Sequence, residues 1–315
     1  MPPSIATIPP ERYTEWQALL QRSFSARWGR EYLRRNFFRD YVTHDPHHRA
    51  RDLVGLMVDG KLASTCQVFR RRMVIGTRGF QVEGIGNVGT DVDAQGQGYG
   101  AALLRGYLRG WRRGDATFVF AREGELYRKL GWQRLVSHRL TVDRRLIAGT
   151  PRRGMVHARR VTSRDLPALA RIYTRFNRAE GLPHVVRSAA YWTRWVAWKL
   201  KVYRLTADIF LEGARPVGYA FWSQLERGTV IEEYGALPSA RSRVYPAMLG
   251  AAAGTRIVTA VHVMRPARSL EQFLDAAGVE YQIARAPHET GHAIAWNPAL
   301  RPASRRLALW HVDHF

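Results

Sequence analysis

Hydrophobic and polar positions in the first half of the chain follow helical and strand periods in alternation. Apolar residues recur every three or four positions from Glu11 to Arg22 and again from Tyr99 to Trp111, which predicts two helices. Residues 53–58 and 62–74 have the pattern of two strands, and Asp59-Gly60 between them is a strong hairpin turn. The same analysis predicts further strands at 81–92, 117–121 and 132–142 and a short helix at 125–130.

The second half repeats this order of elements. Helices are predicted at 165–177 and 189–200, followed by a hairpin over 209–222 that turns at Glu212-Gly213. The elements expected after the hairpin are a strand at 230–237, a helix at 245–253, a strand at 257–263, a helix at 270–277 and a strand at 279–283. The shared order indicates a duplicated α/β unit.

Chain length and composition agree with two domains. A chain of 315 residues is about twice the size of a typical domain. The stretch from Asp143 to Gly154 is polar and basic and contains Gly and Pro, which is typical of a linker. We therefore expect one domain over residues 1–150 and a second over residues 155–315.

The net charge is strongly positive, because 49 Lys and Arg residues face only 26 Asp and Glu residues, a formal charge of +23. Such an excess suggests nucleic acid, a membrane surface or a phosphorylated ligand as the partner. However, Lys occurs only at positions 61, 129, 199 and 201, so 45 of the 49 basic residues are Arg. A GC-rich genome produces this preference without selection for binding, so we do not expect nucleic acid as a partner.

Cysteine content and the N-terminus exclude further classes. Cys66 is the only cysteine, which excludes an intrachain disulfide and a Cys-rich zinc site. The start Met1-Pro2-Pro3-Ser4 lacks the basic and apolar regions of a secretory signal, and no apolar run reaches 18 residues. We expect a cytoplasmic protein that does not bind membranes; the sequence gives no indication of its oligomeric state.

The segment from Gly86 to Leu104 indicates a ligand site. It is predicted as a strand, a Gly-rich turn and a helix start, an arrangement that directs several backbone N–H groups at one point beside the positive end of the helix dipole. The P-loop pattern is absent, and Gly96, Gly98 and Gly100 are spaced G-x-G-x-G rather than as the dinucleotide fingerprint G-x-G-x-x-G. These residues favour a pyrophosphate site of another kind.

Gln95, Gly98 and Gly100 fill the acetyl-CoA signature [QR]-x-x-G-x-[GA], and a second motif, Tyr127-x-x-x-Gly131-Trp132, follows at the expected distance. With these two motifs the chain resembles the GNAT superfamily of N-acetyltransferases. Within it, the tandem order of elements is most similar to the Eis-type (enhanced intracellular survival) enzymes, which pair an active GNAT domain with a degenerate second one. Two residues depart from that pattern: Val92 stands at the usual Pro, and Gln95 at the usual first Arg of the loop. The sterol-carrier-like third domain of Eis-type proteins is not expected here.

The resemblance implies an α/β (α+β) fold with two tandem GNAT-like domains, each a mixed, mostly antiparallel central sheet flanked by helices. It also implies acetyl-CoA as the acyl donor and no metal. The backbone of Val88 and Thr90 would pair with the pantetheine arm, and the loop amides would hold the pyrophosphate. The cofactor-binding residues implied are Val88, Gly89, Thr90, Gln95, Gly96, Gln97, Gly98, Tyr99, Gly100, Arg122 and Glu123. In the second half, residues 239–246 lack the signature, so we expect no CoA there.

Direct attack of an amine on a thioester needs an acid for the leaving thiolate and a base for the amine proton. Tyr127 stands at the position of the family's general acid. For the base, three candidates stay open: Glu83 near the start of the CoA strand, the C-terminal carboxylate of Phe315, which would follow the Eis-type solution, and water. The other interpretation of Glu83 is a surface charge at the end of a strand.

The acceptor is expected to be a primary amine of an unidentified small molecule or peptide, neutral or anionic apart from that amine because the protein is so basic. A polycationic acceptor would need a local acidic patch, for which Glu232-Glu233 is a candidate. The alternatives are a tandem-GNAT transferase that uses aminoacyl-tRNA and a non-catalytic GNAT-fold binding protein.

Four further groups of residues are candidates for other roles. The aromatic residues Tyr191, Trp192, Trp195 and Trp198 are predicted either as core or as a wall of the acceptor pocket. Residues 70–72, three consecutive arginines, are predicted as a solvated edge. Two histidine-containing trios, His44, His47 and His48 and then His311, Asp313 and His314, have no fixed spacing of metal ligands.

Overall fold

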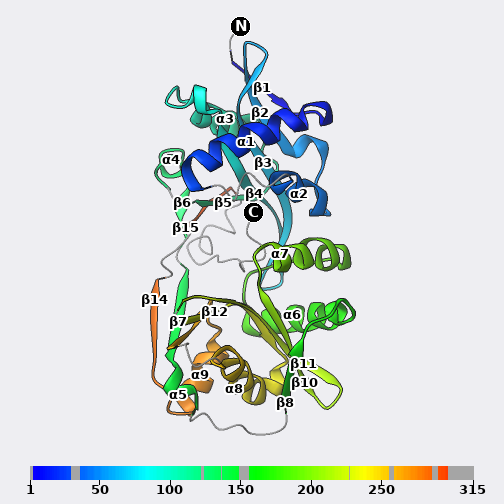
Figure 1. Cartoon of the computed structure of the whole chain (residues 1–315), viewed down its shortest axis with the longest axis vertical. Coiled ribbons are helices and arrows are strands. Elements are labelled where there is room, and N and C mark those ends of the chain that lie inside the picture. Colours follow the sequence, from blue (N-terminus) through cyan, green and yellow to red (C-terminus); the bar gives the residue numbers. More distant parts are fainter. Residues whose placement is uncertain are drawn as a thin grey trace.

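The computed structural model describes residues 3–29, 36–121, 124–135, 137–148, 156–226, 228–254, 259–285 and 290–296. Two mixed sheets flanked by helices lie one above the other along the long axis of the molecule, with the sheet of the first half at the top of Figure 1. No helix within the described ranges has the length and apolar content needed to cross a membrane.

The first sheet is built largely from the first half of the chain. In spatial order its strands are β1 (Ser4–Thr7), β2 (Leu53–Val58), β3 (Lys61–Ile75), β4 (Arg78–Thr90), β5 (Ala116–Ala121), β15 (Thr290–Ala295) and β6 (Gln133–Arg134), and β9 (His184–Val185) pairs with β3. Neighbours are antiparallel except β4 and β5, which are parallel. The hairpin between β2 and β3 is confirmed: Asp59 and Gly60 both have positive φ, 47° and 76°, as a tight hairpin turn requires.

Helices cover both faces of this sheet. On β2, Leu53 packs with the cluster of α1 (Tyr13–Trp28) and α2 (Phe37–His44), whereas Val54 packs with that of α3 (Tyr99–Gly106). Because successive strand residues point to opposite faces, the two clusters lie on opposite sides of the sheet. The short helix α4 (Glu125–Lys129) contributes Tyr127 to the α3 side.

The second sheet has the same plan. In spatial order its strands are β14 (Tyr281–Arg285), β7 (His138–Asp143), β13 (Ala260–Met264), β12 (Gly228–Ala236), β11 (Arg215–Gln224), β10 (Thr206–Glu212) and β8 (Val156–Arg160). Here β12 and β13 form the parallel pair, as β4 and β5 do in the first sheet. The helices around it are α5 (Arg144–Ala148), α6 (Leu166–Glu180), α7 (Ala197–Val202), α8 (Arg241–Ala252) and α9 (Arg268–Ala276).

Each half of the chain contributes to the sheet of the other half: the first half gives β7 to the second sheet, and the second half gives β9 and β15 to the first. Strand β7 lies between β13 and β14, with Leu140 opposite Val263, and β15 lies between β5 and β6, with Ala293 opposite Phe118. The prediction of one strand over 132–142 is therefore wrong, because β6 and β7 belong to different sheets. Neither sheet is complete without the other half. The proposed division into 1–150 and 155–315 stays a prediction, since residues 149–155 lie outside the described ranges.

The aromatic residues of 191–198 form the core that joins the two halves. Trp195 and Trp198 pack against Tyr41 of α2 with ring centroids 5.9 and 4.9 Å apart, and Trp192 packs against Tyr173 of α6 at 5.7 Å. All of them are buried. The core interpretation is confirmed, and none of them is among the residues lining the cavity described below.

Candidate active site

An open strand edge runs along the end of β4. The parallel ladder between β4 and β5 extends from Val82–Ala116 to Ile85–Val119, while β4 itself continues to Thr90. Positive φ at Asn87 (48°) and a register shift against β3 mark a bulge just beyond the last pair. Past this bulge the two strands are no longer paired in the described ladder, so the backbone up to Thr90 offers an edge to which an extended ligand arm can be added.

The Gly-rich loop connects this edge to α3. Residues 95–98 are exposed, and Gly96 and Gly98 have φ of 80° and 77°. Gly98 is the N-cap of α3 and has no side chain to cap it, so the amides of the first helical turn stay open to an anion. A Cβ at either position would meet no atom within 4 Å, so it is the left-handed backbone that requires glycine there.

We expect Gly98→Ala to raise the Kd for acetyl-CoA roughly fivefold, because placing alanine at this φ costs about 1–2 kcal/mol unless the loop shifts. Isothermal titration calorimetry measures this Kd. Gly76→Ala is the matched control, since Gly76 also has positive φ (59°) and open space around it but lies in the β3–β4 turn. Equal Kd values for the two variants would contradict a role of the loop in binding.

The start of the loop is held by a residue that sequence reasoning missed. Arg22 of α1 forms an ion pair with Asp91 and lies 3.8 Å from Asp93. Both carboxylates flank the turn just before the Gly-rich loop. No sequence signal distinguished Arg22 from the other exposed arginines. Of the predicted cofactor residues, Arg122 and Glu123 lie outside the described residues.

Tyr127 lies on α4 on the α3 side of the sheet. Its ring packs between Trp132 (5.9 Å) and His292 (6.3 Å), and only 8% of the residue is exposed. Burial raises its pKa well above the usual range, so the hydroxyl keeps its proton at neutral pH, the state in which a general acid acts. His292 comes from the exchanged strand β15, and a side chain at Gly124 would collide with its ring. The second half of the chain therefore shapes the surroundings of Tyr127.

A cavity of about 660 Å³ lies where the two halves meet. It is lined from four places: the loop after α2, the facing strands β3 and β4, the turn before β5, and the segment after β9. The lining residues are Pro46, His47, His48, Arg49, Arg51, Arg70, Arg71, Arg72, Gln81, Val82, Glu83, Arg113, Gly114, Val186 and Ser188.

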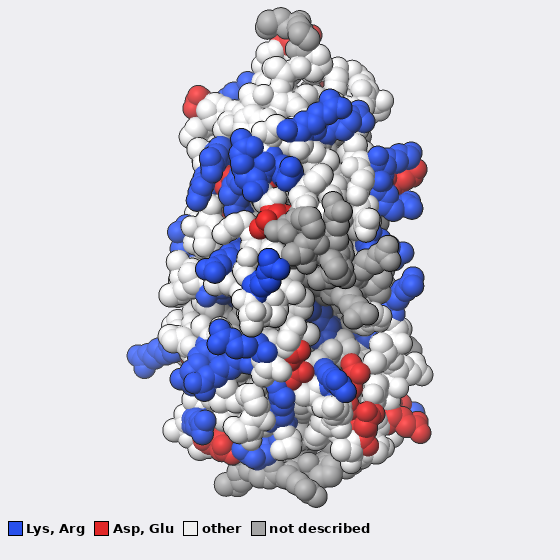
Figure 2. Space-filling view, turned by 180° about the vertical axis from the view of Figure 1, so that it is seen from behind, with Lys and Arg blue, Asp and Glu red and all other residues white. Residues whose placement is uncertain are grey.

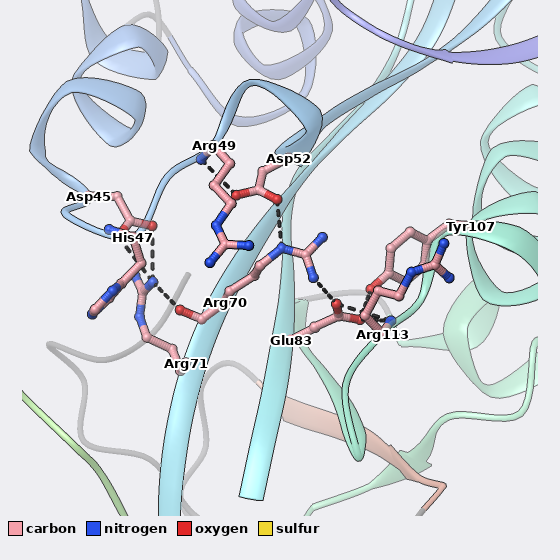
Figure 3. Close-up of polar contacts among 9 residues, drawn as sticks. All are labelled: Asp45, His47, Arg49, Asp52, Arg70, Arg71, Glu83, Tyr107 and Arg113. Atoms are coloured by element: carbon pink, nitrogen blue, oxygen red, sulfur yellow. Dashed lines mark hydrogen bonds and ion pairs between the residues drawn. The ribbon is translucent and has the colours of Figure 1, made fainter.

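Glu83 lies in the interior of β4, where only 2% of it is exposed, so the interpretation as a surface charge is wrong. Its carboxylate accepts hydrogen bonds from the Arg70 guanidinium, the Tyr107 hydroxyl and the backbone N–H of Arg113 (Figure 3). Burial together with the Glu83 charge raises the pKa of Tyr107 far above the usual range. Glu83 is thus a buried carboxylate at the cavity wall with three fixed donors; its role as a base stays a prediction.

Arg70 and Arg71 are not part of a solvated edge, because both pair with carboxylates and Arg71 is buried, whereas Arg72 is exposed. Arg70 pairs with Asp52 at 2.8 Å as well as with Glu83. Arg71 is buried, pairs with Asp45 at 3.0 Å, and its guanidinium lies 5.0 Å from the ring centre of Trp195. The prediction failed because the spacing of charged residues along a strand does not show which neighbours cover it.

The histidines of the first trio have structural surroundings. Burial, with a smaller contribution from the Arg71 charge, lowers the pKa of His47; burial also lowers that of His48. Both are therefore neutral at pH 7. His44 stacks on Trp198 with ring centroids 5.1 Å apart. Within the described ranges, no group of three or more His, Cys, Asp and Glu residues is arranged to hold a metal. The second trio and Phe315 lie outside those ranges.

The second half differs at the positions that would bind CoA. A 3₁₀ turn, Pro238–Ala240, runs directly into α8 at Arg241, whereas residues 95–98 separate the corresponding turn from α3. The hydroxyl of Tyr234 on β12 accepts a hydrogen bond (2.7 Å) from the backbone N–H of Ala267, which lies beyond the end of β13. This contact therefore bridges the ends of β12 and β13, whereas the corresponding strands of the first sheet, β4 and β5, are open at this point.

Glu233 is not part of an acidic patch either. It is fully buried beside Arg187, with which it forms two hydrogen bonds of 2.8 and 2.7 Å, and it accepts a third from Tyr219. A carboxylate neutralised in this way cannot attract a polycation.

Comparisons with known proteins show what this chain is similar to. Residues 4–135 match the family model described as an acetyltransferase (GNAT) domain. A GCN5-related N-acetyltransferase from Kribbella flavida superposes with a TM-score of 0.70 at 17% identity, over 96% of this chain and 73% of that one. Eis1 from Mycobacterium abscessus superposes with a TM-score of 0.64 at 14% identity, over 96% of this chain and 76% of that one.

A third similar structure is a probable N-acyltransferase from Enterococcus faecalis V583, with a TM-score of 0.71 at 16% identity, over 94% of this chain and 73% of that one. No curated protein sequence matches the chain. At these identities the superpositions establish the fold, which extends over nearly the whole chain. The match to the GNAT acetyltransferase domain itself covers residues 4–135, the part of the chain that holds the open edge and the Gly-rich loop.

Proposed function

We propose that the protein is an acetyl-CoA-dependent N-acetyltransferase that acetylates a primary amine of a small molecule or peptide. The observation that supports this most directly is the continuity of three features on the first sheet. The open edge of β4 up to Thr90 runs into the Gly-rich loop that begins α3, and the protonated hydroxyl of Tyr127 belongs to the same side of the sheet as α3.

The chain's own groups fit this donor. The loop amides at the start of α3 suit a pyrophosphate, and backbone groups of Val88 and Thr90 suit an amide-containing arm. Acetyl-CoA, when bound, supplies an acetyl thioester that an uncharged amine attacks directly. A backbone N–H at Val88 would stabilise the negative charge that develops on the carbonyl oxygen.

Acetyl transfer to an amine requires one proton to leave the amine and one to reach the departing thiolate. The new C–N bond forms as the C–S bond breaks; the amine loses one proton, and the thiolate gains one from the Tyr127 hydroxyl. The proton acceptor is Glu83, the C-terminal carboxylate of Phe315, or water. Glu83 already accepts hydrogen bonds from Arg70, Tyr107 and Arg113, which favours one of the other two.

Removing residues 313–315 tests the C-terminal carboxylate. If that group is the base, we expect kcat to fall about 100-fold or more, the low end of the range for general base catalysis. The melting temperature and the Kd for acetyl-CoA should stay within error of the full chain. Unchanged turnover in a normally folded truncation would exclude this carboxylate.

Thermal shift with acetyl-CoA, CoA and tRNA tests the function itself. A ligand at 100 times its Kd stabilises the native state by about 2.7 kcal/mol, and only acetyl-CoA and CoA should do so. Thiol release with a panel of amines then reports turnover. A shift with tRNA alone would favour an aminoacyl-tRNA-dependent transferase, and a shift with acetyl-CoA without thiol release would favour a non-catalytic binding protein.

A further inference from the structure

The cavity between the halves has an unusual charge. Its lining contains six arginines, Arg49, Arg51, Arg70, Arg71, Arg72 and Arg113, and a single acidic residue, Glu83. Figure 2 shows Lys and Arg side chains over both halves of the face opposite to that of Figure 1, so exposed positive charge alone does not distinguish a site. What distinguishes the cavity is that six arginines from three places, the loop before β2, strand β3 and the turn before β5, line one hollow.

The carboxylates near the cavity are already paired. Asp52 and Glu83 both bind Arg70, and Asp45 binds Arg71. Among the residues that the structure describes, no acidic side chain forms an ion pair with Arg49 or Arg51. Six arginines against three carboxylates leave a surplus of three positive charges at this hollow.

Arg49 and Arg51 are the arginines best placed to bind an anionic ligand. Both are exposed and lie in the short loop before β2, and the backbone N–H of Arg49 is fixed by a 2.8 Å hydrogen bond to Asp52. In Figure 3 the guanidinium of Arg49 extends from this loop towards Arg70. The guanidinium of Arg113, by contrast, donates to the backbone carbonyls of Gly110 and Arg112.

The cavity also lies within reach of the reacting end of the donor. Glu83 in its wall is three residues from Gly86, where β4 has just left its parallel partner. At about 3.3 Å per strand residue this is roughly 10 Å. A volume of about 660 Å³ is within the range of small-molecule sites, about 300–1,000 Å³. A small amine in this cavity is therefore close enough to reach the thioester.

We propose that this cavity binds an anionic group of the acceptor, a carboxylate or a phosphate, through the guanidinium groups of Arg49 and Arg51. The substrate class is thus a small amine that also carries a carboxylate or a phosphate. Arginine suits both anions because its planar donors match two oxygens at once. This inference rests on the proposed acetyltransferase activity.

Matched amines test the inference. O-Phosphoethanolamine is compared with ethanolamine, and 4-aminobutanoate with butylamine and 1,4-diaminobutane. We expect kcat/KM to be at least tenfold higher for one anionic amine than for its neutral partner, and the diamine to be the poorest of its set. A difference in kcat/KM for the ethanolamine pair would indicate a phosphate as the bound anion, and a difference for the butyl amines would indicate a carboxylate. Equal values for anionic and neutral amines would overturn the inference.

The variant Arg49→Gln/Arg51→Gln locates the site. We expect the ratio of kcat/KM for the anionic amine to that for its neutral partner to fall about tenfold or more, as expected for hydrogen bonds between charged groups. Arg215→Gln, at an exposed arginine of β11 in the second sheet, is the control with one charge removed and should keep the ratio. An unchanged ratio in the double variant would overturn the assignment of these residues.

A binding measurement separates the two proposals. In thermal shift without acetyl-CoA, the better of the two anionic amines should stabilise the wild type and Arg215→Gln but not the double variant. No stabilisation by either anionic amine would overturn the site. If acetyl-CoA stabilises the wild type and neutral amines are acetylated equally well, only the inference fails. If acetyl-CoA does not bind, the proposed function fails.

Discussion

Tyr127→Phe is expected to lower kcat about 100- to 1,000-fold, within the range that a positioned general acid contributes. The variant loses only a hydroxyl, and the ring contacts with Trp132 and His292 are kept. Folding and acetyl-CoA binding should therefore stay intact, as measured by melting temperature and titration calorimetry. Stopped assays of thiol release give kcat directly.

The pH profile provides a second readout of the same residue. A general acid works in its protonated form, so activity is lost as pH rises through its pKa. Because burial raises the pKa of Tyr127, we expect no loss from this group up to pH 10, above which an ordinary tyrosine ionises. A fall in kcat centred below pH 9 that disappears in Tyr127→Phe would contradict the raised pKa.

Tyr13→Phe is the matched control, since Tyr13 begins α1 on the other face of the first sheet. It should keep the wild-type kcat within about twofold. If Tyr127→Phe retains more than a tenth of the wild-type kcat, the leaving thiolate takes its proton from elsewhere, and water becomes the simplest donor.

Glu233→Ala is expected to reduce the free energy of unfolding by about 3–5 kcal/mol, the cost of removing one partner of a buried ion pair. The Arg187 and Glu233 side chains are both fully buried, and the Arg187 guanidinium also lies 4.0 Å from the ring centre of Tyr173. Without the carboxylate, a positive charge would stay in a site closed to water. Chemical denaturation monitored by tryptophan fluorescence measures the change.

Two control variants separate the contributions of charge and of hydrogen bonding to this loss of stability. Glu233→Gln keeps an acceptor for Arg187 but removes the negative charge, so we expect a smaller loss than with alanine. Tyr219→Phe removes only the third hydrogen bond to Glu233 and should cost about 1 kcal/mol. A loss below about 1 kcal/mol for Glu233→Ala would mean that the pair does not stabilise this core.

Local signals in the sequence predicted most of the elements and the cofactor loop. The Asp59-Gly60 turn fixed a hairpin because both residues tolerate positive φ, and Gly96 and Gly98 have the left-handed backbone that their spacing suggested. The expected helix from Tyr99 to Trp111 is α3 followed by a π-helical turn, Tyr107–Trp111. Such features depend on a few consecutive residues, so they can be identified without knowing the fold.

Contacts between distant segments could not be predicted in this way. Nothing in 132–142 indicates that β6 stays in the first sheet while β7 joins the second, since hydrophobic alternation specifies a strand but not its partner. For the same reason His292 could not be connected with Tyr127, nor Arg187 with Glu233. The prediction of solvated charge failed at Arg70 and Arg71 because a charged residue in a sequence looks the same whether it is solvated or paired.

The sequence by itself determined the mixed α/β character, the Gly-rich loop and the Tyr127 motif, because backbone conformation and periodicity are local properties. Tertiary structure alone decided the exchange of β7 and β15, the burial of Glu83 and Arg71, and the gathering of six arginines around one cavity. These depend on which surfaces meet when the two halves pack, and burial together with the distance between charges then sets how each side chain behaves.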